Sequence, residues 1–174
     1  MAYAPNPDLL KKSDLMGKAQ FGMDQEQIKA LKGGEPFSEG QGHYYLIAYV
    51  QKLGGLPCLQ VYGFSDNKLL YIYYEILNTS DNLKLAPVED YQAWFAALKM
   101  LYGPPAVIKN PWENDPELLK RIGREKIGEY SWEEPTYILS LLLYPGSEEG
   151  SPTYRGRGHI AIYLIDNTKV KVDS

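Results

Sequence analysis

Histidine and cysteine are the residues of this chain that could support catalysis or bind a metal, and the chain has few of them. His43 and His159 each begin a run that reads as a strand, so their imidazoles could meet at one sheet edge and bind a metal together with a carboxylate. Neither an H-x-x-x-H motif nor a cysteine pair supports that site, and two independent strand-end histidines are the alternative. Cys58 could be a nucleophile near His43 on the neighbouring strand, or a small buried hydrophobic side chain.

The motifs of the common enzyme classes are missing from the sequence. Ser147 lacks a G-x-S-x-G context, and neither a Walker loop nor a complete G-x-G-x-x-G occurs. A single cysteine excludes an intramolecular disulfide and a Cys-rich zinc site. We therefore expect no cofactor and favour a non-enzymatic binding module. The alternative is a small hydrolase or metal-dependent enzyme with a site near His43, Cys58 and His159.

Tyrosine is the residue type that points most directly to binding. The chain has 15 tyrosines. Ten of them fall on predicted strands: Tyr44, Tyr45, Tyr49, Tyr62, Tyr71, Tyr73, Tyr74, Tyr137, Tyr144 and Tyr163. Tyrosine is enriched at interfaces because its ring is apolar and its hydroxyl is polar, although its preference for strands would also place it there. Alternation puts Tyr71 and Tyr73 on one face of the third predicted strand and Tyr74 on the other.

Residues 145–158 form the second candidate contact region. This stretch has no apolar face, and a loop of such length is either functional or mobile. The motif Tyr154-Arg155-Gly156-Arg157 could stack on nucleic-acid bases, but one short copy in an acidic chain favours a positive tip that contacts a protein. The candidate binding residues are Tyr71, Tyr73, Tyr74, Tyr154, Arg155 and Arg157. We expect the partner to be another protein or a second copy of this chain.

Charge and composition limit the partners and the compartment. The net charge of −4 predicts no nucleic-acid partner. The first twenty residues contain charged side chains and no apolar run of seven, so we expect neither a signal peptide nor a membrane span. The expected location is the cytoplasm, or the periplasm or the exterior if a native signal sequence has been lost.

The chain is organised around a predicted helix over residues 87–102. Its apolar stripe recurs at steps of three and four and consists of Val88, Tyr91, Phe95, Leu98 and Tyr102. Pro87 suits the first helical position, and Gly103 followed by two prolines ends the helix. Such a stripe needs a partner surface, so we expect this helix to lie across a sheet.

Strand patterns lie on both sides of that helix. A short helix over residues 25–31, with Asp24 as its N-cap, and a loop over residues 38–42 precede three antiparallel strands within residues 43–77. Gly54-Gly55 and Asp66-Asn67 are the predicted hairpin turns. After the central helix we expect a weaker helix within residues 116–126 and strands over residues 136–144 and 158–165.

These elements predict an α+β protein with an antiparallel sheet of five or six strands and the central amphipathic helix on one face. A helix followed by strands occurs on both sides, which suggests a degenerate α-plus-meander repeat. The predicted organisation is a flexible N-terminal arm over residues 1–20, a single domain over residues 21–167 and a C-terminal tail over residues 168–174.

Three short motifs resemble a known class of small α+β modules. Gly22, Met23 and Ile28 match G-M-[ST]-x-x-x-[VI], with Asp24 in the place of the hydroxyl residue. Phe64, Asp66 and Leu69 match F-x-[DN]-x-x-L, and Tyr102-Gly103-Pro104 resembles the end of a second helix. The chain thus resembles the β-lactamase-inhibitor-protein-like class, which includes bacterial outer-membrane-assembly lipoproteins. It lacks their lipobox cysteine and the paired cysteines of some relatives. The resemblance implies a non-enzymatic module whose sheet presents aromatic residues to a protein partner.

Overall fold

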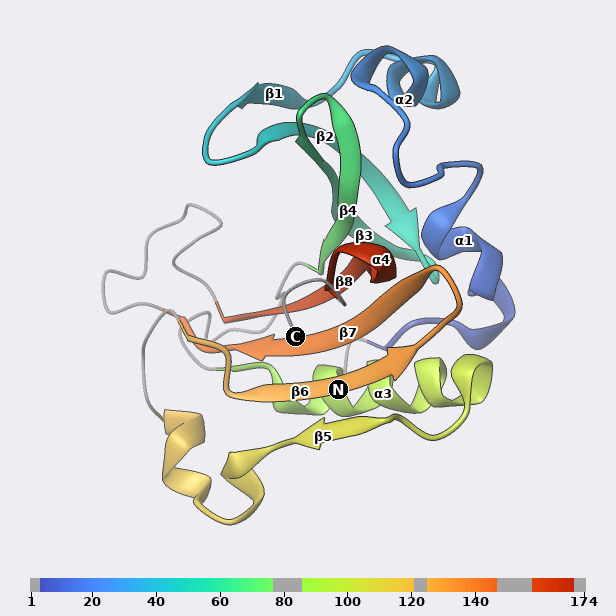
Figure 1. Ribbon diagram of the computed structural model, residues 1–174. Helices are drawn as coiled ribbons and strands as arrows, with labels where there is room; N and C mark the ends of the chain where they lie inside the picture. The colour runs from blue at the N-terminus through green and yellow to red at the C-terminus, as the bar shows by residue number, and fades with distance from the viewer. Residues whose placement is uncertain (1–3, 77–85, 121–124, 147–157, 171–174) are drawn as a thin grey trace.

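The computed structural model describes residues 4–76, 86–120, 125–146 and 158–170. In this part of the chain, the strands form one open antiparallel sheet of eight, with helices packed against it (Figure 1). The predicted α+β class and the antiparallel sheet are confirmed. The predicted number of five or six strands is wrong, because three short or polar strands were not recognised from their residues.

A helix followed by four strands occurs twice along the chain. In chain order the elements are η1 (Pro7–Leu9), α1 (Lys12–Met16), α2 (Gln25–Lys32), β1 (Ser38–Gln41), β2 (Tyr45–Leu53), β3 (Leu56–Ser65), β4 (Lys68–Ile76), α3 (Val88–Tyr102), β5 (Val107–Lys109), η2 (Pro111–Glu113), η3 (Pro116–Lys120), β6 (Gly128–Glu133), β7 (Tyr137–Tyr144), β8 (His159–Asp166) and α4 (Asn167–Val170). The strand order in the sheet is β1-β2-β3-β4-β8-β7-β6-β5. Both α2 and α3 are thus followed by four strands, and β8 lies in the middle of the sheet.

The local signals of the sequence are found where they were predicted. Gly54 and Gly55 have φ of 58° and 82°, and Asp66 and Asn67 have φ of 51° and 55°, so both hairpin turns contain two consecutive residues with positive φ. The Asp24 side chain caps α2 by accepting a hydrogen bond from the backbone N–H of Gln27.

Four segments differ from the prediction. Residues 38–41 are strand β1 and not a loop. All four of its residues are exposed at the sheet edge, so no apolar alternation identifies it. Strands β5 and β6 were not predicted. Of the helix expected within residues 116–126, residues 116–120 form η3, which follows η2, and residues 121–124 lie outside the described residues. Each of these 3-10 helices begins with a proline.

One face of the sheet carries the hydrophobic core. It includes Ile47, Ile72, Leu139, Leu141, Ile162 and Leu164, all fully buried. Helix α3 contributes Trp94 and Leu98 to this core, and the ring of its Phe95 stacks on Tyr130 of β6 with the ring centroids 3.7 Å apart. We call this the core face, and the opposite side the open face.

The N-terminal segment also belongs to the core. The sequence predicts a flexible arm over residues 1–20, but the described part, residues 4–20, buries Leu10, Leu15 and Ala19 in the hydrophobic cluster. At the other end, α4 begins at Asn167, whose side chain donates a hydrogen bond to the carbonyl of Glu134. Short apolar patches such as the leucines of the arm therefore pack onto the sheet even without a long periodic pattern.

The hydroxyl of Tyr74 links the N-terminal segment to the sheet, and its removal should be measurable. The Tyr74 Oη donates a hydrogen bond to the carbonyl of Leu15 and accepts one of 2.8 Å from Gln60 Nε2. Tyr74→Phe leaves both groups without this partner, so we expect the free energy of unfolding to fall by about 1–3 kcal/mol. Urea denaturation of this variant beside Tyr44→Phe, whose ring is half-exposed, measures the effect. Equal stability of the two variants would contradict the assigned role.

Candidate functional site

The open face contains a groove whose wall is built by strands. Its volume is about 710 Å³. Its lining residues come from β1 to β4, β8 and the residue before β1: Phe37, Ser38, Leu46, Ala48, Val50, Pro57, Cys58, Leu59, Val61, Tyr71, Tyr73, Glu75, His159 and Tyr163. Because most of these side chains are aliphatic or aromatic, the groove suits an apolar ligand surface.

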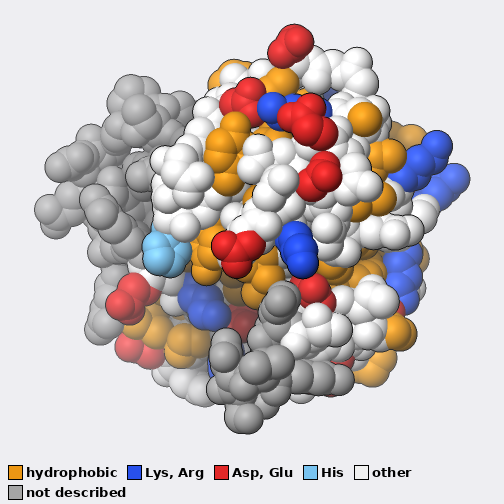
Figure 2. All heavy atoms as spheres, turned by 45° about the horizontal axis from the view of Figure 1, so that its top comes forward, with side chains coloured by type: hydrophobic (Ala, Val, Ile, Leu, Met, Phe, Trp, Pro, Cys, Tyr) orange, Lys and Arg blue, Asp and Glu red, His pale blue; other side chains and the backbone are white. Residues whose placement is uncertain are grey.

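Two large hydrophobic side chains of this wall are open to solvent. Phe37 is 69% exposed and Val50 is 64% exposed. Other hydrophobic side chains also reach the surface among charged ones, as the view in Figure 2 illustrates. Scattered apolar residues are common on protein surfaces, whereas Phe37 and Val50 line the wall of one groove.

A cluster of tyrosines forms one side of the groove. Tyr71 stacks on Tyr163 with ring centroids 5.0 Å apart, and Tyr73 meets Tyr163 edge to face at 5.9 Å. The ring of Tyr71 lies against Gly63, where a Cβ atom would overlap it. Burial raises the pKa of Tyr71 and of Tyr163, so both hydroxyls stay protonated at neutral pH. The cluster therefore presents neutral rings and neutral hydroxyls.

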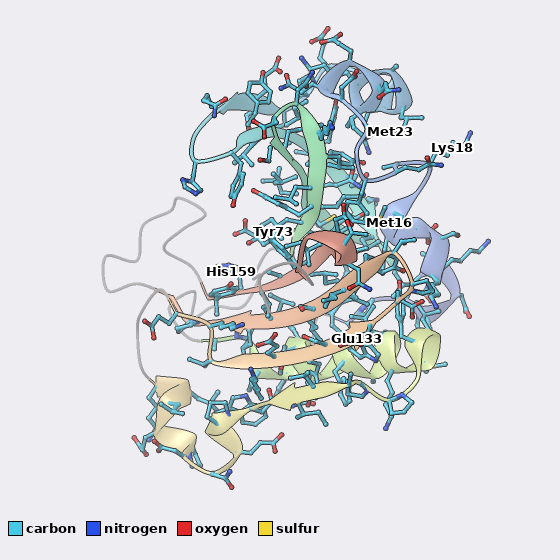
Figure 3. All side chains as sticks on the ribbon, viewed as in Figure 1. Met16, Lys18, Met23, Tyr73, Glu133 and His159 are labelled. Atoms are coloured by element: carbon cyan, nitrogen blue, oxygen red, sulfur yellow. The ribbon has the colours of Figure 1, made fainter. Side chains whose placement is uncertain are left out.

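Glu75 and His159 supply the ionisable pair of the groove. His159 Nε2 lies 3.8 Å from Glu75 Oε1, and the His159 ring stacks on Tyr144 with centroids 4.7 Å apart. Figure 3 shows Tyr73 and His159 on the side of the sheet away from Met16 and Lys18. The pair places a carboxylate and an imidazole beside the apolar wall, where they can orient a polar group of a ligand.

The three residues of the predicted enzyme site do not converge. Cys58 borders the groove, but its neighbours in the strand register, Gln51 and Ile76, are on the core face with it, and its side chain is buried. Burial raises the pKa of the Cys58 thiol to about 12, so a thiolate does not form near neutral pH. His43 is exposed before β2 and packs on Tyr44, away from the groove lining. Among the described residues, no three His, Cys, Asp or Glu side chains gather as metal ligands would.

The predicted binding residues are divided among different places. Tyr71 and Tyr73 lie in the groove, whereas Tyr74 is fully buried in the core and presents no surface to a partner. Tyr154, Arg155 and Arg157 lie outside the described residues. The sequence alone did not single out Phe37, Val50 or Glu75, because only the register of β1 to β4 brings them to one face.

Comparison with protein families, with curated proteins and with solved structures finds no match to this chain. None of the helices in the described segments is long and apolar enough to cross a bilayer.

Proposed function

We propose that this protein is a binding module that holds an apolar segment of a protein partner in the groove of the open face. The observation that carries the proposal is the pair of solvent-exposed hydrophobic side chains, Phe37 and Val50, on the wall of an apolar groove. When a partner covers these exposed apolar side chains, their removal from water favours the complex.

The remaining groove residues support a protein ligand. Tyrosine side chains act as anchors in interfaces because they offer a large contact area and a directional hydroxyl. Tyr71, Tyr73 and Tyr163 provide three such rings side by side. Glu75 and His159 are the acidic and basic groups of the wall, so a segment with a hydrogen-bond donor next to its apolar side chains complements it.

The resemblance to the β-lactamase-inhibitor-protein-like class favours the same function. The order of one helix and four strands, which occurs twice here, fits the α-plus-meander repeat that the sequence suggests. The enzyme alternative has less support, because only His159 of its three residues brings a functional side chain into the groove beside a carboxylate.

Selection from a random peptide display library tests this proposal directly. We expect the immobilised wild type to enrich peptides rich in apolar and aromatic residues. The Phe37→Ser/Val50→Lys double variant should bind the selected peptides about tenfold more weakly, which corresponds to 1.4 kcal/mol. Fluorescence anisotropy with synthetic peptides measures the dissociation constants. The matched control is Met100→Ser/Ile108→Lys, which changes two side chains of 77% and 59% exposure outside the groove.

Two results would contradict this assignment. One is the absence of enriched peptides, and the other is an equal loss of affinity in the control variant. Light scattering after size-exclusion chromatography tests whether a second copy of this chain occupies the groove. The apparent mass of the wild type and of the control variant could rise with protein concentration while that of the groove double variant does not. This result would mean that the groove binds a second copy of the chain and not a different protein.

A further inference from the structure

A second cavity lies on the core face, at the opposite side of the sheet from the groove. Its volume is about 560 Å³, and it is lined by the N-terminal segment, the end of α2, the end of β2 with the turn that follows it, and the middle of β3. Met16 and Lys18, labelled in Figure 3, are part of its wall. We name it the Lys32 cavity, because Lys32 is the cationic group held most firmly in its wall.

Two amide oxygens fix the ammonium group of Lys32. Lys32 Nζ donates hydrogen bonds of 2.9 Å to Gln51 Oε1 and 2.7 Å to Gln60 Oε1. The orientation of the Gln60 amide follows from its other contact. The Tyr74 hydroxyl gives its proton to the Leu15 carbonyl, so it must accept from Gln60 Nε2, which leaves Gln60 Oε1 for Lys32. The ammonium group is therefore held in place before any ligand arrives.

The positive charge of Lys32 has no carboxylate partner within 4.0 Å in the part of the chain that the structure describes. Its neighbours are neutral: two amides and the rings of Tyr49 and Tyr62, whose centroids lie 5.1 Å and 5.9 Å from Nζ. Lys29, on the same helix, is by contrast paired with Glu39 at 2.8 Å. Burial lowers the pKa of Lys32, as expected for a cation without a counter-ion.

The rest of the wall adds positive charge and apolar surface. Lys18 and Lys52 also line the cavity, while the acidic residue of the wall is Asp14. The Asp14 Oδ2 accepts a hydrogen bond of 2.8 Å from the backbone N–H of Lys11, so that oxygen is used in capping the start of α1. In a chain whose net charge is −4, this wall carries three lysines against one carboxylate. Its aliphatic side chains are Leu9, Met16, Ala19, Leu31 and Leu53.

From this arrangement we infer that the Lys32 cavity binds a small organic anion, namely a carboxylate with an apolar body. An ammonium group has three N–H donors, and two of them are used by the glutamines, so the third is available to the carboxylate. The apolar body of the ligand then contacts the leucines and Met16. This inference concerns the other face of the sheet and does not rest on the proposed function.

Nuclear magnetic resonance of the protein with ¹³C-labelled lysine tests the inference. The probes are acetate, hexanoate and benzoate, with benzamide as the neutral counterpart of benzoate. We expect saturable shifts of the Lys32 Cε signal with hexanoate and benzoate at millimolar dissociation constants, and none with benzamide. The pKa of Lys32 should rise when the acid binds, because a nearby negative charge favours the protonated amine. Affinity should fall as the pH rises through that pKa.

Three variants show whether a loss of binding comes from the lost charge of Lys32 or from a loss of folding. Shifts of the backbone amide signals during a benzoate titration measure binding in the variants that lack the Lys32 signal. Lys32→Met should weaken benzoate binding at least tenfold, Lys32→Arg should retain it, and Lys29→Met should leave it unchanged. Amide spectra and melting temperatures establish that each variant is folded. Equal binding of benzamide and benzoate, no saturable shift with any of the three acids, or an equal loss in Lys29→Met would overturn the inference.

Discussion

Replacing Trp94 by alanine should lower the free energy of unfolding by about 3–5 kcal/mol, the usual cost of removing a large aromatic ring from a core. Trp94 is fully buried on α3, and it is the largest of the fully buried side chains. The cavity left by alanine would open between α3 and the core face. Chemical denaturation followed by circular dichroism measures the loss.

Two other variants on the same helix sharpen this test. Met100→Ala changes a side chain that is 77% exposed and should alter stability by less than about 0.5 kcal/mol. The Trp94 indole Nε1 has no hydrogen-bond partner among the described atoms, so Trp94→Phe loses ring volume but no hydrogen bond. The phenylalanine variant should therefore keep more stability than the alanine variant. If the two were equally unstable, packing around Trp94 would not be the cause.

Substituting alanine for Gly63 should weaken binding of the selected peptides by about thirtyfold, the effect of losing one anchor residue worth about 2 kcal/mol. The new Cβ would overlap the Tyr71 ring, so the ring must leave its present position. Its stacking on Tyr163 would be lost at the same time. Fluorescence anisotropy gives the affinity, and the melting temperature shows whether the sheet is intact.

A double-mutant cycle tests whether Gly63→Ala weakens peptide binding by displacing the ring of Tyr71. Tyr71→Ala should lose as much affinity as Gly63→Ala, and the two changes together should lose no more than either alone. Additive losses would mean that Gly63→Ala disturbs the groove by another route, such as the irregular register between Gly63 and Phe64.

Local chemistry explains which parts of the fold could be predicted from the sequence. The turn at Gly54-Gly55, the N-cap Asp24 and the stop at Gly103 depend on residues adjacent in the chain, so their signals are complete within a few positions. Strand β1 has no such signal, because an exposed edge strand buries neither side. In the described part of the helix expected within residues 116–126, residues 116–120 form a 3-10 helix, a form used in short pieces that the partial apolar face of this segment does not distinguish from an α-helix.

The candidate sites are built from residues far apart in the chain, and the periodicity of the sequence does not predict which distant residues come into contact. Alternation correctly separated Tyr71 and Tyr73 from Tyr74, but it could not tell which face the helices cover. Lys32 meets Gln51 and Gln60 across 19 and 28 positions of the chain, so no local pattern reveals its cavity. The fit of the Tyr71 ring against Gly63 likewise requires the register of β3 and β4.

The position of β8 also determines when this sheet can be completed during protein synthesis. Among the described strands β8 emerges last from the ribosome, yet it pairs with β4 and with β7. Until it arrives, the nascent chain carries two partly built sheets whose β4 and β7 edges have unpaired backbone groups and apolar side chains such as Ile72 and Leu139. Unpaired edges can pair with other chains, so the incomplete sheet is more prone to aggregation during this interval than the complete one. The whole sheet therefore assembles only after β8 has been synthesised, at the slow rate typical of pairings between distant segments.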